Sequence, residues 1–117
     1  MPTPLLKSVS SSEFLTTERS AREKHELHGG HVVAMAGASL VHNEIVANLL
    51  GAIKVQLKGK PCRIYPSDLR VSVPTADSFT YPDATIVCGK PEMIDDEFDT
   101  LTNPTVIIEV MSATTEQ

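Results

Sequence analysis

The sequence has no tryptophan and few other aromatic residues, with three Phe and two Tyr. Val, Ile, Leu and Met therefore have to fill most of the core, and hydrophobic residues make up 41% of the chain. A chain of 117 residues with this composition is expected to form one domain with a small core. We expect residues 1–10, rich in Pro, Ser and Thr, to be a flexible arm and residues 11–117 to form the domain.

Long apolar runs and cysteine motifs are also lacking. No apolar run reaches the roughly 18 residues of a membrane span, and the N-terminal segment has no signal-peptide core. Cys62 and Cys88 lack the CxxC spacing of structural zinc sites. Both lie in apolar runs, so we expect reduced, buried thiols, with a disulfide as the alternative. These features predict a cytoplasmic protein with no membrane partner.

Negative charge exceeds positive charge, and the formal net charge is −5. This balance counts against broad electrostatic attraction to nucleic acid, which depends on Lys and Arg. A local basic groove stays open, with a solvated surface as the alternative. The residues that could form it are Lys54, Lys58, Lys60, Arg63 and Arg70. Neither a Walker-type loop nor a GxSxG motif is present, which disfavours P-loop and serine-hydrolase chemistry.

Hydrophobic periodicity predicts a mixed α/β (α+β) fold with the element order α-β-β-α-β-β-β-β. A first helix is expected over about residues 12–22, capped by Ser11 or Ser12. Gly29 and Gly30 predict a hairpin turn. A second helix over residues 40–58, capped by Ser39, has an apolar stripe at i+4 spacing, with His42 off the stripe. The stripe residues are Val41, Ile45, Leu49, Ile53 and Leu57.

Two acidic residues lie in apolar, strand-like runs further along the chain. Asp83 lies in residues 81–88, and Glu109 lies in residues 104–110. A carboxylate in such a run is costly unless it is paired, hydrogen-bonded or bound to a metal. On neighbouring strands the two could hold one Mg²⁺ or Mn²⁺ ion, which prefer hard oxygen ligands. The alternative is that each lies at a strand end in solvent or pairs with an arginine.

Other polar residues are weaker candidates for the site. Asp68 begins a strand predicted over residues 68–73, where it is either a helper acid or a cap of the preceding turn. His42, at the start of the second helix, is read as structural, exposed or substrate-facing. His25, His28 and His31 alternate around the hairpin, but no cysteine stands nearby, which disfavours zinc.

Short motifs in order along nearly the whole chain resemble one known family. They include residues 13–15, 24–27, 33–39, 42–43, 65–71, 81–83, 87–89 and 103–110. With them the chain resembles the Uma-two family, bacterial proteins classed with the PD-(D/E)xK restriction-endonuclease-like superfamily. The resemblance implies a mixed sheet flanked by helices and a metal-dependent endonuclease that hydrolyses DNA phosphodiester bonds. It also implies that Asp83 and Glu109 bind Mg²⁺.

The chain departs from that family in three respects. Met111 stands where the lysine after the second acid would fall, and no lysine follows before Gln117. His31 replaces an acidic residue after the hairpin glycine. The usual C-terminal strands and helix are lacking, and residues 114–117 fit a capping box with no helix after it. The alternative is therefore an inactive fragment that acts as a binding or oligomerisation module. We also expect a homodimer or other homo-oligomer, because the lacking elements would leave an apolar edge or face exposed.

Overall fold

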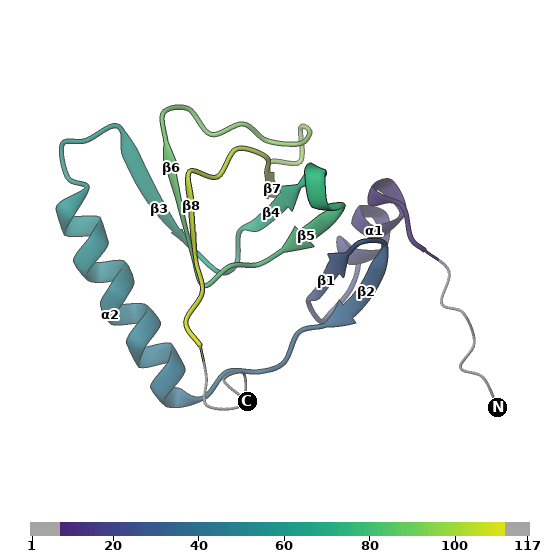
Figure 1. Cartoon of the computed structure of the whole chain (residues 1–117), viewed down its shortest axis with the longest axis horizontal. Coiled ribbons are helices and arrows are strands. Elements are labelled where there is room, and N and C mark those ends of the chain that lie inside the picture. The colour runs from purple at the N-terminus through teal and green to yellow at the C-terminus, as the bar shows by residue number, and fades with distance from the viewer. Residues whose placement is uncertain (1–7, 112–117) are drawn as a thin grey trace. The chain divides into compact units, whose positions relative to one another are not determined.

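The computed structural model describes residues 8–111, so the predicted capping box at residues 114–117 and most of the predicted arm lie outside the described residues (Figure 1). The fold is mixed α+β, with two helices and two sheets, which confirms the predicted class. Contacts divide the chain into two units. The first comprises the residues up to Ala36 together with Ser72–Thr80, and the second comprises Gly37–Val71 and the residues from Tyr81 onward.

The first unit begins with helix α1 (Ser11–Glu18), which is shorter than predicted. Its cap is Ser10, one residue before the predicted position: Ser10 Oγ accepts a hydrogen bond from the Glu13 N–H, and the Glu13 carboxylate accepts one from the Ser10 N–H. The backbone bond makes the Ser10 site the stronger cap, because two orphan donors are satisfied at once. Hydrogen bonding to the backbone N–H of Ser10, and then to its side chain, also lowers the pKa of Glu13, since these contacts favour the charged carboxylate.

Strands β1 (His25–His28) and β2 (His31–Ala34) form the predicted hairpin. Gly29 and Gly30 make its turn with φ angles of +56° and +87°, which glycine adopts without steric cost. Strand β5 (Ser78–Thr80) pairs with β1 on the other side. The sequence predicted a loop there and missed β5, which follows a short 3₁₀ turn over Pro74–Ala76.

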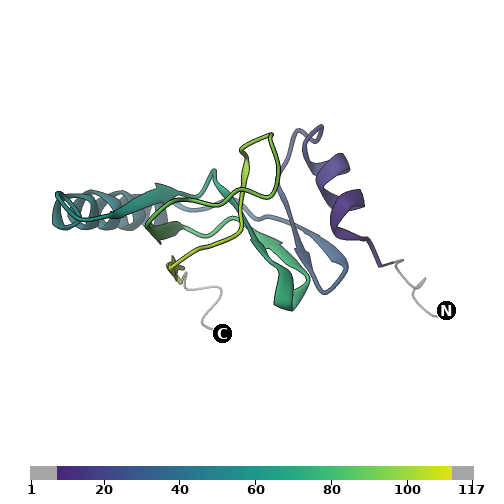
Figure 2. The same ribbon diagram turned by 90° about the horizontal axis from the view of Figure 1, so that it is seen from above.

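The core of the first unit lies between α1 and these strands. Phe14 and Leu15 of α1 pack with Leu27 of β1 and Phe79 of β5. The rings of Phe14 and Phe79 stack with centroids 5.2 Å apart. Figure 2 shows α1, in purple, beside the strands that it covers. Val9 extends this core, and its N–H donates to the carbonyl of Gly30 over 2.8 Å.

The second unit contains helix α2 and a three-stranded antiparallel sheet in the order β3-β6-β8. Its elements are α2 (Leu40–Gln56), β3 (Cys62–Pro66), β6 (Ala84–Cys88) and β8 (Val106–Ile108). Helix α2 runs beside β3 (Figure 1). Ser39 caps α2, as predicted, because its Oγ accepts a hydrogen bond from the His42 N–H over 3.1 Å. Among the described residues, no helix is long and apolar enough to cross a membrane.

The face that α2 turns toward its own unit differs from the predicted stripe. Val41 and Ile45, two predicted stripe residues, are 63% and 47% exposed. The other three stripe residues, Leu49, Ile53 and Leu57, are half-buried as predicted, and so are His42, Val46 and Leu50. Apolar residues surround this helix on most sides, so their spacing alone did not determine which side is covered.

Strand β4 (Arg70–Val73) starts later than the predicted strand over residues 68–73. Its first two residues pair in parallel with β7 (Thr100–Leu101), a strand that the sequence did not predict in the acidic segment 89–103. Arg70 and Ser72 are both buried, although their side chains are polar. Arg70 is buried with partners: its Nε donates to the Tyr81 hydroxyl, and its Nη1 donates to Thr100 Oγ1 and lies 3.1 Å from Asp99 Oδ2.

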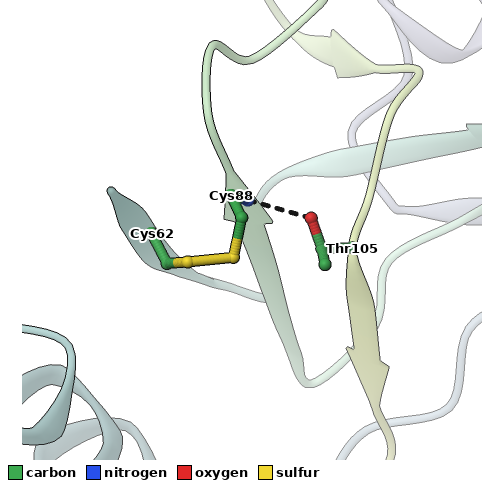
Figure 3. Close-up of a disulfide and its surroundings, with 3 residues drawn as sticks. All are labelled: Cys62, Cys88 and Thr105. Carbon is green, nitrogen blue, oxygen red and sulfur yellow. Dashed lines mark hydrogen bonds between the residues drawn. A yellow bond between two sulfur atoms is a disulfide. The ribbon is translucent and has the colours of Figure 1, made fainter. Parts of the chain in front are cut away.

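The prediction of reduced cysteines is wrong. Cys62 at the start of β3 lies directly opposite Cys88 at the end of β6, and a disulfide joins them (Figure 3). The Cys88 N–H also donates to Thr105 Oγ1 over 2.9 Å. The prediction failed because it treated the two runs separately, and only the register of β3 and β6 brings the two residues together.

Candidate functional site

The two predicted acids lie at adjoining ends of neighbouring strands. Strands β6 and β8 are antiparallel, and Ala84 lies opposite Ile108. Asp83 directly precedes β6 and Glu109 directly follows β8, so the two acids flank paired strands at the same end of the sheet. The adjacency of the two strands, on which the prediction of a shared site depended, is therefore present.

Asp83 is held by hydrogen bonds on both carboxylate oxygens. Its Oδ1 lies 3.0 Å from Nε2 of His42, and its Oδ2 accepts the Val110 N–H over 2.7 Å. The Asp83 side chain is 17% exposed, so only a small part of it is accessible to solvent. A carboxylate offers about four lone-pair sites, and two of these stay available to a ligand.

His42 is the contact residue that sequence reasoning missed. It was placed off the covered side of α2, whereas its side chain is only 15% exposed and reaches the residue that precedes β6. One sequence signal could have found it: His42 continues the half-buried positions Val46, Leu49 and Ile53 toward the N-terminus at helical spacing. That pattern predicts an inward side chain, and an inward histidine needs a polar partner.

Asp68 reaches the same end of the sheet but lies outside the regular strands. It is exposed, in the turn between β3 and β4. The last residue of β3, Pro66, lies opposite Ala84, so Asp68, Asp83 and Glu109 all follow or precede strands at one end of the β3-β6-β8 sheet. Within residues 8–111, no group of three His, Cys, Asp or Glu side chains is arranged to hold a metal ion. The chain thus brings Asp83 and Glu109 to neighbouring strands, and Asp68 only to the same end of the sheet.

Known proteins resemble this chain in sequence and in fold. It matches the Uma2 family, which is described as "Putative restriction endonuclease", over residues 11–117. The chain belongs to the Uma2 family. The uncharacterized proteins sll1609 and slr1290 of Synechocystis sp. are each 32% identical to it, over 91% and 98% of this chain. Each match covers 60% of the relative, so the chain spans about 60% of the length of these curated relatives.

A solved structure supports the nuclease-like fold. It is described as a "putative nuclease belonging to DUF820" from Anabaena variabilis, and it superimposes with a TM-score of 0.70. The match covers 91% of this chain and 60% of that chain, at 19% identity. At this identity the likeness concerns the fold alone, which the Uma2 chain shares with that structure over most of its length.

The donor chemistry at the Uma2 sheet end fits a hard divalent cation. Asp83 and Glu109 supply carboxylate oxygens, which Mg²⁺ and Mn²⁺ prefer, and two protein carboxylates suffice where water and a phosphate complete the octahedron. Glu109 is exposed and therefore reachable from solvent. The position of the motif lysine is occupied by Met111, which is 59% exposed and has no proton to donate.

A basic groove lies in the second unit, between the C-terminal part of α2 and strand β3. Its volume is about 720 Å³. Lys54 and Lys58 of the helix segment and Arg63 of β3 line it together with Tyr65 and apolar side chains. Of the five basic residues that the sequence offered for such a groove, the structure brings these three together, while Arg70 is engaged in its buried network.

Proposed function

We propose that this Uma2 chain is a metal-dependent endonuclease-like protein that acts on the phosphodiester bonds of DNA. Membership of the family and the nuclease-like fold support a nuclease at the coarser level. One observation supports the finer proposal: β6 pairs with β8, and Asp83 and Glu109 directly flank these two strands at the same end of the sheet. Both residues are assigned as ligands of Mg²⁺ or Mn²⁺, and Asp68 as a helper from the adjoining turn.

In this proposal the chain's own residues bind the metal ion and hold the orientation of the Asp83 carboxylate. A divalent metal at the site supplies Lewis-acid activation of water and neutralises charge on the phosphoryl group. Asp83 binds through its free lone pairs while the Val110 N–H fixes its plane. Because Met111 cannot stabilise developing charge as a lysine does, we expect slow turnover from these 117 residues alone.

The basic groove is the proposed contact surface for the DNA backbone. Phosphate binding relies on Lys and Arg, and Lys54, Lys58 and Arg63 supply three such charges in a chain whose net charge is −5. Tyr65 adds an aromatic side chain at the same groove, and aromatic rings stack on unpaired bases. The groove therefore gives an acidic protein a local surface for an acidic polymer.

Calorimetric titration with Mn²⁺ tests the metal assignment. We expect binding by the unaltered chain and a loss of at least about tenfold in affinity for Asp83→Ala and for Glu109→Ala. Asp96→Ala is the matched control, because Asp96 is an exposed acid of the segment between β6 and β7. Equal affinities for all four proteins would show that the two acids do not bind the metal.

The second candidate is a module that binds or self-associates without catalysis. It is favoured by the exposed apolar residues of α2, with Leu40 and Val55 each 74% exposed and Val41 63% exposed. Large exposed apolar patches mark interaction surfaces. Analytical ultracentrifugation tests the self-association of this candidate: a homo-oligomer that Val41→Glu with Ile45→Glu converts to monomer supports it, and a monomeric unaltered chain excludes self-association.

A further inference from the structure

The pair formed by His42 and Asp83 differs from the other histidine–carboxylate pairs of the chain. His28 pairs with Glu26, two residues away on the same strand, and His25 pairs with Glu18, seven residues away. The contact between His42 and Asp83 joins positions 41 residues apart, linking the first turn of α2 to the start of β6. It is also well covered, with side chains 15% and 17% exposed, whereas those of His28 and Glu26 are 50% and 23% exposed.

The geometry fixes which atom of His42 can act. An ionised carboxylate only accepts hydrogen bonds, so Nε2, 3.0 Å from Asp83 Oδ1, has to carry the proton and donate it. On the other oxygen the Val110 N–H donates over 2.7 Å. Two donors on opposite oxygens prevent rotation of the carboxylate about its terminal torsion, which is otherwise broad. The remaining lone pairs of Asp83 are thereby held in one direction.

We propose that His42 is a positioning residue, which orients Asp83 for binding a divalent metal ion. This inference rests on the proposed function for the metal itself and adds a role that the carboxylate pair alone does not require. Ligating carboxylates are commonly held by hydrogen bonds from a second layer of residues, and losing such a partner typically costs about 10–100-fold in metal affinity. His42 acts through Asp83, and the Ser39 cap fixes the backbone of His42.

The first experiment needs no metal. Long-range ¹H–¹⁵N spectra of the imidazole nitrogens report which nitrogen of His42 carries the proton. We expect the proton on Nε2 in the unaltered 117-residue chain and a changed ¹⁵N pattern for His42 in Asp83→Ala, with His28 as the internal reference. A neutral His42 protonated only at Nδ1 overturns the proposal, because such a ring cannot donate to Asp83.

The second experiment measures Mn²⁺ affinity by calorimetry in three histidine variants. His42→Ala is expected to bind about 10–100-fold more weakly. His42→Gln keeps an N–H donor on a side chain of similar reach, so it should recover a large part of that loss. His28→Ala, which removes an exposed pair with the same 3.0 Å separation, should match the unaltered chain.

The outcomes separate this proposal from the one on which it rests. Weakened binding in Asp83→Ala together with unchanged binding in His42→Ala leaves the metal site in place and overturns the positioning role. Equal losses in His42→Ala and His42→Gln also overturn it, because the donor then makes no difference. Unchanged binding in Asp83→Ala overturns the metal assignment itself, and with it any metal role for His42. Should His42→Ala fail to fold, the Gln variant and the ¹⁵N spectra still decide.

Discussion

Cys62 lies directly opposite Cys88 across strands β3 and β6, and the disulfide between them closes the end of the sheet away from Asp83. The bond links residues 26 positions apart, so it restricts the unfolded chain. Because Cys62 also lines the basic groove, the same bond fixes one wall of that groove.

Removal of this disulfide is expected to lower the free energy of unfolding by about 3 kcal/mol, since an intact bond reduces the entropy of the unfolded chain. Chemical denaturation of Cys62→Ser with Cys88→Ser, and of the unaltered chain with and without reductant, measures the effect. The double variant should not respond to reductant. Two titratable thiols in the unreduced, denatured protein would contradict the presence of the bond.

Tyr81→Phe is expected to destabilise the second unit by about 1–3 kcal/mol, because it leaves the buried Nε–H of Arg70 without the acceptor that it has now. Thermal or urea unfolding gives the value. Tyr65→Phe removes a hydroxyl from a half-buried tyrosine of the groove and should stay within about 0.5 kcal/mol of the unaltered chain. Equal effects of the two substitutions would argue against the Arg70 network as a source of stability.

Ser10→Ala is expected to cost about 1 kcal/mol at neutral pH, because it removes the side-chain cap of α1. The pKa of Glu13 is lowered in the folded state, so its contribution to stability is present above the ordinary pKa of 4.5 and is lost as the pH falls through the lower folded value. Thermal unfolding from pH 7 to pH 3 should therefore show a smaller pH dependence in Ser10→Ala. Ser11→Ala, at an exposed neighbouring position, should keep the full dependence.

Lys58→Ala and Arg63→Ala are each expected to weaken binding of single-stranded DNA and to reduce the slope of log affinity against log salt by about one, as one phosphate contact is lost. Fluorescence anisotropy over a range of salt concentrations measures both quantities. Lys60→Ala is the matched control, since Lys60 is exposed and does not line the groove. A loss in Lys60→Ala as large as the other two would mean that charge in general, rather than the groove, binds DNA.

Local sequence signals predicted those features that depend on a few neighbouring residues. The hairpin at Gly29 and Gly30 and the Ser39 cap are of this kind. The strands β5 and β7 were missed because each has three residues or fewer, too short for a period to emerge. Their positions depend on partners distant in the sequence.

The candidate site shows the same division. Acids in apolar runs drew attention to Asp83 and Glu109, and the pairing of β6 with β8 brings the strands that they flank side by side. The disulfide was not predicted because it depends on which strands pair, and helical spacing could have placed His42 on the covered side of α2 without identifying Asp83 as its partner. The resemblance to the Uma2 family supplied the fold class that these long-range pairings create.

The orientation of Asp83 depends on whether the first turn of α2 stays folded, because the cap of α2 holds the backbone of His42. Ser39 Oγ holds the N–H of His42, the residue whose ring holds Asp83, so the first turn of α2 connects a surface hydroxyl to the carboxylate in two steps. Terminal helical turns open locally at low free-energy cost when their caps are weak. Each opening of this turn would release the imidazole and leave the Val110 N–H as the donor that still holds Asp83. The lifetime of the oriented carboxylate would then be set by the closing and opening of one helical turn.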